Sequence, residues 1–227
     1  MSMLLSPRLR RIADYVPPGA TVVDVGTDHA YVPIWLLQEG VSRRAYGTDV
    51  KAGPLERARL DAERYDVLDR LTLWLCDGLA LCPPEAVDTV ILAGMGGETM
   101  MGILERSPWA LEKRLILQPQ TKWPELRRYM AERGLAVLDA SLADDAGRIY
   151  LIWLVGAGET AGECHVDQAL LKKRDPLLKP WLQDRIKRCG KQLRGLELAR
   201  QPDEAAIAGQ RAELEELKRV YQEVLAW

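Results

Sequence analysis

The sequence lacks the residue patterns that mark several common kinds of site and segment. Its four cysteines show no C-x-x-C spacing, and its only histidines are His29 and His165. A metal site or a disulfide framework is therefore not expected. No signal peptide and no long apolar span appear, which predicts a cytoplasmic protein with no membrane partner. Phenylalanine is absent, and seven tryptophans and seven tyrosines supply the aromatic bulk.

The three-glycine fingerprint of a dinucleotide site is missing from the stretch where a nucleotide site is expected. The apolar run Val22–Val25 predicts a buried strand, Gly26 ends it, and a helix is expected from Ala30 to Gln38. In a dinucleotide site, further glycines let two phosphates lie against bare backbone. Here two carboxylates, Asp24 and Asp28, flank the single glycine; they repel pyrophosphate and suit an ammonium or sulfonium group. The stretch favours S-adenosylmethionine over NAD, with an ordinary strand-to-helix turn as the alternative.

The chain has no large excess of charge of either sign, but its charges are segregated. The 227 residues allow one α/β domain of about 150 residues and an appendage. The formal net charge is −2, yet residues 172–200 hold ten cations against three acids. From residue 201 onward the sign reverses, with six acids against three bases. A basic block of this kind can bind nucleic acid locally, or it can be a solvated helix face.

Acidic residues end the next two expected strands. Asp49 ends a strand over Arg44–Asp49 and lies 23 residues after the glycine turn, where an acid can accept hydrogen bonds from ribose hydroxyls. A strand over Leu71–Cys76 ends in Asp77 and Gly78, where a carboxylate can accept a hydrogen bond from an adenine amino group. Ligands of open α/β sheets bind outside these strand ends. The alternatives are a helix-capping aspartate and an ordinary turn.

A glycine-rich loop follows the fourth expected strand, Thr89–Ala93. It contains Gly94, Gly96 and Gly97, and three glycines within four residues indicate unusual dihedral angles or close backbone contact. Many enzymes that methylate exocyclic amines have Asn/Asp-Pro-Pro-aromatic at this position. Its absence argues against exocyclic amine chemistry, and a purely structural loop is the alternative.

Strands alternate with helices until a terminal hairpin. A helix is expected over Leu4–Tyr15, with Ser6 as its N-cap. A fifth strand is expected over Leu115–Leu117, and Ala136–Ala143 with Ile149–Val155 indicate a β-hairpin. This order predicts an α/β fold with a Rossmann-like, seven-stranded, mostly parallel sheet in which one strand is reversed.

The last third of the chain has a helical pattern. Residues 156–163 contain three glycines and are the expected linker, so the predicted domains are 1–158 and 159–227. Apolar residues recur every three or four positions in two later segments separated by Pro202 and Asp203. The apolar stripe of the first segment consists of Leu178, Leu182, Ile186, Cys189, Leu193 and Leu196. The stripe of the second consists of Leu214, Leu217, Tyr221 and Val224. Two such helices joined by a short turn predict an antiparallel coiled-coil hairpin.

The motifs together resemble the bacterial TrmK family, which methylates N1 of adenine at position 22 of tRNA with S-adenosylmethionine. The resemblance rests on Leu-Ser-Pro-Arg-Leu from Leu5, Asp-Val-Gly-Thr-Asp-His-Ala-Tyr-Val-Pro from Asp24, Ala-Gly-Met-Gly-Gly from Ala93 and Leu-Ile-Leu-Gln-Pro from Leu115. It continues through Pro-Glu-Leu-Arg and Gly-Arg-Ile-Tyr. Gln120 departs from the family, which usually has Asn there. The resemblance implies a class I methyltransferase domain and a C-terminal coiled-coil domain that helps to hold tRNA.

The resemblance also implies roles for individual residues. Around the cofactor it places Asp24, Gly26, Asp28, Asp49, Asp77 and Gly94, and the neighbouring Thr27, Val50, Gly78, Ala93 and Met95 are further candidates for cofactor binding. Candidate catalytic residues are Asp28, His29 and Tyr31. Candidate contacts to the target base are Gly96, Gly97, Gln118 and Pro119. Candidate phosphate contacts are Arg8, Arg10, Arg11, Lys172, Lys173, Arg174, Lys187, Arg188 and Lys191.

This reading predicts a reaction in which positioning dominates the rate, because N1 of adenine carries a lone pair and needs no strong base. The target base lies within folded tRNA and must be extruded into the site. Two alternatives stay open. The chain could methylate another RNA, a protein or a small molecule, or it could be an inactive fold that binds RNA. No metal is expected, and the expected oligomeric state is a monomer.

Overall fold

The structure is a computed structural model, and it describes residues 3–159, 165–199, 201 and 203–227. The chain divides into two compact units, Met1–Thr160 and Ala161–Trp227. This division lies two residues after the predicted boundary. The predicted linker begins too early, because its first two residues, Gly156 and Ala157, belong to the last strand of the first unit. Residues 160–163 of that linker lie outside the described residues.

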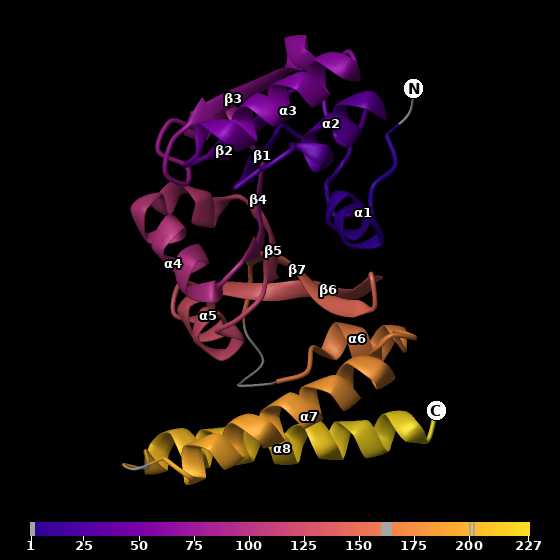
Figure 1. The fold of residues 1–227 in the computed structure, drawn as a ribbon, viewed down its shortest axis with the longest axis vertical. Coiled ribbons are helices and arrows are strands. Elements are labelled where there is room, and N and C mark those ends of the chain that lie inside the picture. Colours follow the sequence, from indigo (N-terminus) through magenta and orange to yellow (C-terminus); the bar gives the residue numbers. More distant parts are fainter. Residues whose placement is uncertain (1–2, 160–164, 200, 202) are drawn as a thin grey trace. The chain divides into compact units, whose positions relative to one another are not determined.

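The first unit is built on one sheet of seven strands in the order β3-β2-β1-β4-β5-β7-β6 (Figure 1). Its strands are β1 (Val22–Val25), β2 (Ala45–Asp49), β3 (Leu71–Leu75), β4 (Thr89–Met95), β5 (Arg114–Pro119), β6 (Leu135–Asp145) and β7 (Arg148–Ala157). Strands β1 to β5 pair in parallel, whereas β7 runs antiparallel to both β5 and β6. The predicted seven-stranded Rossmann-like sheet with one reversed strand is therefore confirmed.

The central position of β1 explains its sequence. Val22 pairs with Ala45 of β2 on one side and with Thr89 of β4 on the other, and all four residues of β1 are buried. A strand that is covered on both faces has a continuous apolar run rather than an alternating one. The same arrangement brings the carboxyl ends of β3, β2, β1 and β4 to one edge of the sheet, where they can form one site.

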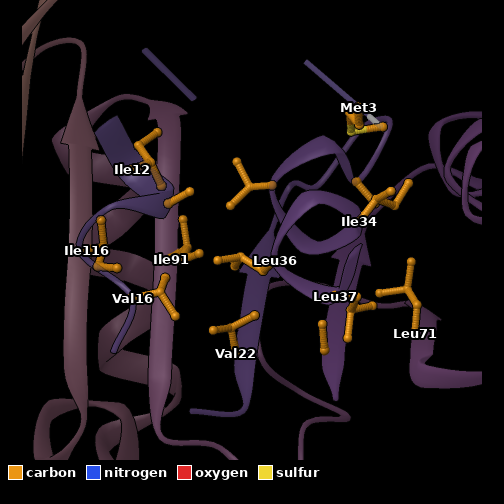
Figure 2. Close-up of a cluster of buried hydrophobic side chains, with 14 of the residues drawn as sticks. Met3, Ile12, Val16, Val22, Ile34, Leu36, Leu37, Leu71, Ile91 and Ile116 are labelled. Atoms are coloured by element: carbon orange, nitrogen blue, oxygen red, sulfur yellow. The ribbon is translucent and has the colours of Figure 1, made fainter. Parts of the chain in front are cut away.

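Helices cover both faces of this sheet (Figure 1). They are α1 (Pro7–Ala13), α2 (Tyr31–Gln38), α3 (Ala52–Arg64), α4 (Gly97–Arg106) and α5 (Trp123–Ala131), with short 3-10 helices at Leu68–Arg70, Pro84–Ala86 and Pro108–Glu112. Ile12 of α1 and Ile34 of α2 belong to one buried apolar cluster with Val22, Ile91 and Ile116 of three adjacent strands, and Ile12 lies near Ile91 and Ile116 (Figure 2). These side chains are fully buried, so burial of this apolar face fixes α1 and α2 against the sheet.

The first helix is shorter than predicted. Ser6 occupies the N-cap position, but its side chain makes no capping hydrogen bond. Its Oγ instead donates to Oδ2 of Asp145 at 2.7 Å. Ser6 is thus the N-cap residue as predicted, but its side chain binds the β6–β7 hairpin beside the start of α1 and does not cap the helix.

The second unit consists of α6 (Gln168–Lys173), α7 (Leu178–Glu197) and α8 (Glu204–Leu225). Helices α7 and α8 run antiparallel (Figure 1), joined by contacts such as Gln183 Nε2 to the Tyr221 hydroxyl and Gln210 Nε2 to Cys189 Sγ. The buried residues are Leu178, Trp181, Leu182, Cys189, Leu193, Ile207, Leu217, Val220 and Val224. Of the predicted stripe on α7, Ile186 and Leu196 are only half-buried.

Pro202 and Asp203 are predicted to separate the last two helices, and the structure describes the second of them. Asp203 is the N-cap, and its side chain accepts a hydrogen bond from the backbone N–H of Ala206 at 3.0 Å. Pro202 lies outside the described residues. Within the part of the chain that the structure describes, no helix is both long and apolar enough to cross a membrane.

Candidate active site

A cavity of about 660 Å³ opens at the carboxyl ends of β1 to β4. Its volume lies within the range of about 300–1,000 Å³ that is typical of sites for small ligands. Seven residues predicted to surround the cofactor line it: Gly26, Asp28, Asp49, Val50, Asp77, Gly78 and Met95. Four other predicted cofactor residues lie outside this lining: Asp24, Thr27, Ala93 and Gly94.

The lining also contains residues that the sequence analysis missed. They are Val25, Thr48, Lys51, Pro54, Arg57, Cys76, Thr99 and Ile103. Pro54 and Arg57 lie one turn apart near the start of α3, and Thr99 and Ile103 lie one turn apart in α4. Their spacing of three or four residues puts each pair on one helix face. That spacing is the signal by which they could have been found.

The turn after β1 is held in an unusual conformation. Gly26 has a φ of +68°, and the non-glycine residues Asp28 and Ala30 also have positive φ angles, of 49° and 53°. The backbone N–H groups of Gly26 and Thr27 both donate to the carbonyl of Thr48, at 2.8 and 3.0 Å. Non-glycine residues with positive φ are uncommon and are enriched where a backbone serves a function. The turn thus places Asp28 at the cavity.

Asp24 lies beneath this turn and not in the cavity lining. It is 8% exposed, and Oγ1 of Thr27 donates to its Oδ2 at 2.7 Å. Burial raises the pKa of Asp24 to about 7, although the hydrogen bond from Thr27 and the charge of Arg8 both lower it. Asp24 and Thr27, predicted to bind the cofactor, therefore form a buried pair that supports the turn.

The acids of the cavity have positively charged or N–H partners. Arg57 of α3 pairs with Asp28 at 3.0 Å, and Arg106 of α4 pairs with Asp77 at 3.0 Å. Oδ1 of Asp49 accepts a hydrogen bond from the backbone N–H of Lys51 at 2.9 Å. Both ion pairs are more than half exposed, so they contribute little to stability and can exchange partners with a ligand.

The predicted catalytic residues separate in the structure. Asp28 lines the cavity, whereas His29 and Tyr31 do not. Nδ1 of His29 lies 2.9 Å from Oδ2 of Asp61, and its ring stacks on Tyr31 with centroids 4.9 Å apart. Asp61 lies on α3, and nothing in the local sequence pointed to it as the partner of His29.

The glycine loop of residues 94–97, which spans the end of β4 and the first residue of α4, has structural reasons for its small residues. A Cβ at Gly96 would lie 2.9 Å from Oγ1 of Thr121, and one at Gly97 would lie 2.7 Å from the carbonyl oxygen of Lys122. Gly94 has a φ of +77° and sits at a bulge, because Ala93 pairs with Gln118 but Met95 pairs with Pro119. The structural alternative for this loop thus accounts for Gly96 and Gly97.

The three arginines of the first helix differ in their surroundings. Nη1 of Arg8 donates to Oε1 of Gln118 at 3.1 Å, so one nitrogen of its guanidinium is engaged inside the first unit, and the phosphate contact predicted for Arg8 stays a prediction. Arg10 pairs with Asp14 at 2.8 Å and lies over the Trp35 ring, and Arg11 lies 3.7 Å from Asp14.

The candidate phosphate contacts of the second unit are all exposed. They are Lys172, Lys173, Arg174, Lys187, Arg188 and Lys191. Arg174 lies over the Trp227 ring, and Arg188 pairs with Asp184 one turn earlier on α7. Among the described residues, no group of three or more His, Cys, Asp or Glu side chains could hold a metal ion.

The comparisons with known proteins all find methyltransferases. Residues 5–153 match the family model of the methyltransferase domain. A curated Bacillus subtilis protein, tRNA (adenine(22)-N(1))-methyltransferase, is 30% identical over 157 residues, which are 68% of this chain and 66% of that protein. The chain thus spans slightly less than two thirds of this relative's length.

Two crystal structures extend the similarity to the whole chain. Streptococcus pneumoniae Sp1610 in complex with S-adenosyl-L-methionine superposes with a TM-score of 0.83 at 28% identity, covering 96% of this chain and 100% of that chain. The structure of Bacillus subtilis TrmK superposes with a TM-score of 0.84 at 24% identity, covering 97% and 100%. The second similarity shows a shared fold that includes the C-terminal helices.

Proposed function

This chain belongs to the methyltransferase-domain family, and on that premise we propose that it transfers a methyl group from S-adenosylmethionine to N1 of the adenine at position 22 of tRNA. The resemblance to the TrmK family predicted from the motifs is confirmed by the similarity to the Bacillus subtilis enzyme. The substrate assigned to that enzyme, and the cofactor bound by the pneumococcal protein, support the same assignment for this chain.

One observation carries the proposal: acids from three adjacent strands line a single cavity. Asp77 follows β3, Asp49 ends β2 and Asp28 follows β1, and these strands lie side by side in that order. These three acceptor carboxylates fit S-adenosylmethionine, whose amino, hydroxyl and ammonium groups all donate hydrogen bonds to carboxylates. The positive φ of Gly26 lets the backbone approach such a ligand without a side chain in between.

The order of the strands determines the proposed orientation of S-adenosylmethionine in the cavity. Asp77 accepts from the adenine amino group, Asp49 accepts from the ribose hydroxyls, and Asp28 orients the amino-acid end. When bound, S-adenosylmethionine supplies an activated methyl group on its sulfonium. With the adenosine held at β3 and β2, the reacting end points past β1 toward the glycine loop at the end of β4 (residues 94–97). The residues of that loop then face the methyl acceptor.

The protein's proposed contribution to the chemistry is placement. The acceptor N1 has its own lone pair, so a base strong enough to remove a proton is not needed before the attack. Asp28 is the candidate catalytic residue that lies in the cavity. His29 and Tyr31 lie beside it, stacked on each other, and we assign them to the rim where the extruded base enters.

The direct test of this function is transfer of labelled methyl from S-adenosylmethionine to tRNA. Label is expected in a tRNA with adenine at position 22 and not in the same tRNA with guanine there. Equal labelling of both tRNAs would point to another site. Cofactor binding with no labelled tRNA would favour another substrate. Failure to bind the cofactor at high concentration would leave the inactive RNA-binding fold.

We further propose that the exposed cations of α6 and α7 bind the tRNA backbone. Reversing Lys187, Arg188 and Lys191 to Glu is expected to weaken tRNA binding by about tenfold or more near 0.1 M salt, because phosphate contacts dominate affinity. The salt dependence of the affinity should also become shallower. Fluorescence anisotropy of labelled tRNA measures both quantities.

A matched control uses the exposed Arg43, Arg44 and Arg114, which lie at or just before the amino ends of β2 and β5, away from the cavity. Reversing these three to Glu changes the net charge equally and should alter tRNA affinity much less. Cofactor affinity should be unchanged in both triple variants. Equal tRNA affinity in the wild type and the α7 variant would remove these cations from the tRNA-binding surface. A monomeric state and a cytoplasmic location stay predictions.

A further inference from the structure

The peptide N–H of Gly94 is held by a side chain and not by the sheet. Gly94 is the extra residue between Ala93 and Met95, so the register of β4 and β5 provides no partner for it. Its N–H donates instead to Oε1 of Gln118 at 3.1 Å. Gln118 is 1% exposed and lies on β5 opposite Ala93. A buried glutamine therefore fixes the orientation of the Gly94 peptide at the edge of the site.

The same oxygen of Gln118 accepts a second hydrogen bond, from Nη1 of Arg8 at 3.1 Å. Two donors on Oε1 orient the whole amide, and its Nε2 then faces the carbonyl of Pro119 at 3.4 Å. A cationic donor also strengthens a hydrogen bond in a buried setting. Arg8 thus acts on Gly94 through Gln118 and not by a direct contact.

Arg8 is itself held by groups from three other elements. Its Nε lies 3.7 Å from Oδ2 of Asp145, and its guanidinium lies 5.2 Å from the centre of the Tyr150 ring. Its positive charge also acts on Asp24, whose pKa it lowers. In addition, Nη1 of Arg8 lies 3.6 Å from the position that a Cβ of Gly94 would take. These interactions hold the guanidinium beside the bulge.

From these contacts we infer that Arg8 and Gln118 are positioning residues that set the Gly94 peptide for the methyl acceptor. The inference rests on the proposed function, in which the glycine loop at the end of β4 (residues 94–97) faces the target base. It differs from two predicted roles, a phosphate contact for Arg8 and a direct contact to the base for Gln118. Because small misplacements of reacting groups cost large factors in rate, loosening this peptide should lower kcat more than it affects cofactor binding.

The test compares two replacements of Gln118. Gln118→Leu removes the acceptor and is expected to lower kcat for tRNA at least tenfold while the Kd for S-adenosylmethionine stays within twofold. Gln118→Glu keeps an acceptor for both donors and should retain kcat within about threefold. Arg114→Gln, at the exposed start of the same strand, is the matched control and should leave both quantities unchanged.

Arg8→Gln tests the residue that acts on Gly94 through Gln118. It should lower kcat about fivefold alone and add nothing to Gln118→Leu, because both changes remove the same constraint. Amide hydrogen exchange gives a readout independent of activity: the Gly94 N–H should exchange at least tenfold faster in Gln118→Leu and remain protected in Gln118→Glu.

Different experimental outcomes would overturn this inference and the proposed function. A kcat within twofold of wild type for Gln118→Leu, additive effects of the two changes, or an equal loss of cofactor affinity would overturn the inference. If wild-type protein methylates no tRNA, the proposed function fails, and the exchange rates then decide whether the pair holds the Gly94 peptide. If Gln118→Leu does not fold, two variants still test the inference: Arg8→Gln, for which kcat should fall about fivefold, and Gln118→Glu, for which kcat should stay within about threefold and the Gly94 N–H should remain protected.

Discussion

Replacing Asp24 with asparagine is expected to remove a pH dependence of stability of about 4 kcal/mol between pH 4 and pH 8. Burial raises the pKa of Asp24 from 3.8 to about 7 in the folded chain. Between these two values the folded protein keeps a proton that the unfolded chain releases, so the free energy of unfolding falls as pH rises. Each unit of pKa difference corresponds to about 1.36 kcal/mol, which gives the expected size.

The asparagine variant has no proton to lose at this position, and its side-chain oxygen can still accept the hydrogen bond from Thr27. It should match the wild type near pH 4 and be more stable than the wild type near pH 8. Urea denaturation across this range measures the difference. Asp69→Asn is a control at a side chain that is 78% exposed, and it should leave the pH profile unchanged. Parallel profiles for the wild type and Asp24→Asn would contradict the expectation.

Gly97→Ala is expected to destabilise the fold by about 3 kcal/mol and to abolish most of the methyl-transfer activity. The added Cβ would lie 2.7 Å from the carbonyl oxygen of Lys122 and 2.9 Å from that of Thr121. Both atoms belong to the backbone and cannot swing away. The N–H of Gly97 also donates to the carbonyl of Thr121, so the clash would separate the glycine loop from the start of α5.

Gly102→Ala is the matched control, because it makes the same change in the same helix, α4. There the added Cβ would lie 3.3 Å from Nη1 of Arg106, the far end of a flexible side chain. Replacing a glycine inside a helix with alanine stabilises it by about 0.5–1 kcal/mol, so this variant should be slightly more stable than the wild type. Thermal denaturation and labelled transfer measure both variants. Equal melting temperatures for the two would show that the loop tolerates a side chain.

The local sequence predicted the framework of the site well. Val22, Val23 and Val25 form a short run of β-branched apolar residues that predicts a buried strand, and Gly26 itself predicts the turn that follows. Asp49 and Asp77 follow consecutive strands, and parallel strands put their carboxyl ends on one edge. The fourth strand extends past its predicted end at Ala93, because the bulge at Gly94 lets pairing with β5 continue to Met95.

Partners of the site residues could not be predicted in the same way. Arg57 is 29 residues from Asp28, and Asp61 is 32 residues from His29, so no local periodicity relates them. Each pair forms because α3 packs beside the turn that follows β1. The sequence also could not distinguish Asp24, which is buried, from Asp28, which lines the cavity.

By itself, the sequence determined the strand and helix pattern, the acids at the strand ends and the resemblance to one methyltransferase family, since these depend on residue types and on short spacings along the chain. Only the tertiary structure decided which charges meet. Arg8 and Gln118 are 110 residues apart, and their contact at the Gly94 bulge exists only after α1, β4 and β5 have packed together. The physical reason is that hydrogen bonds and ion pairs act over a few ångströms, whatever the distance along the chain.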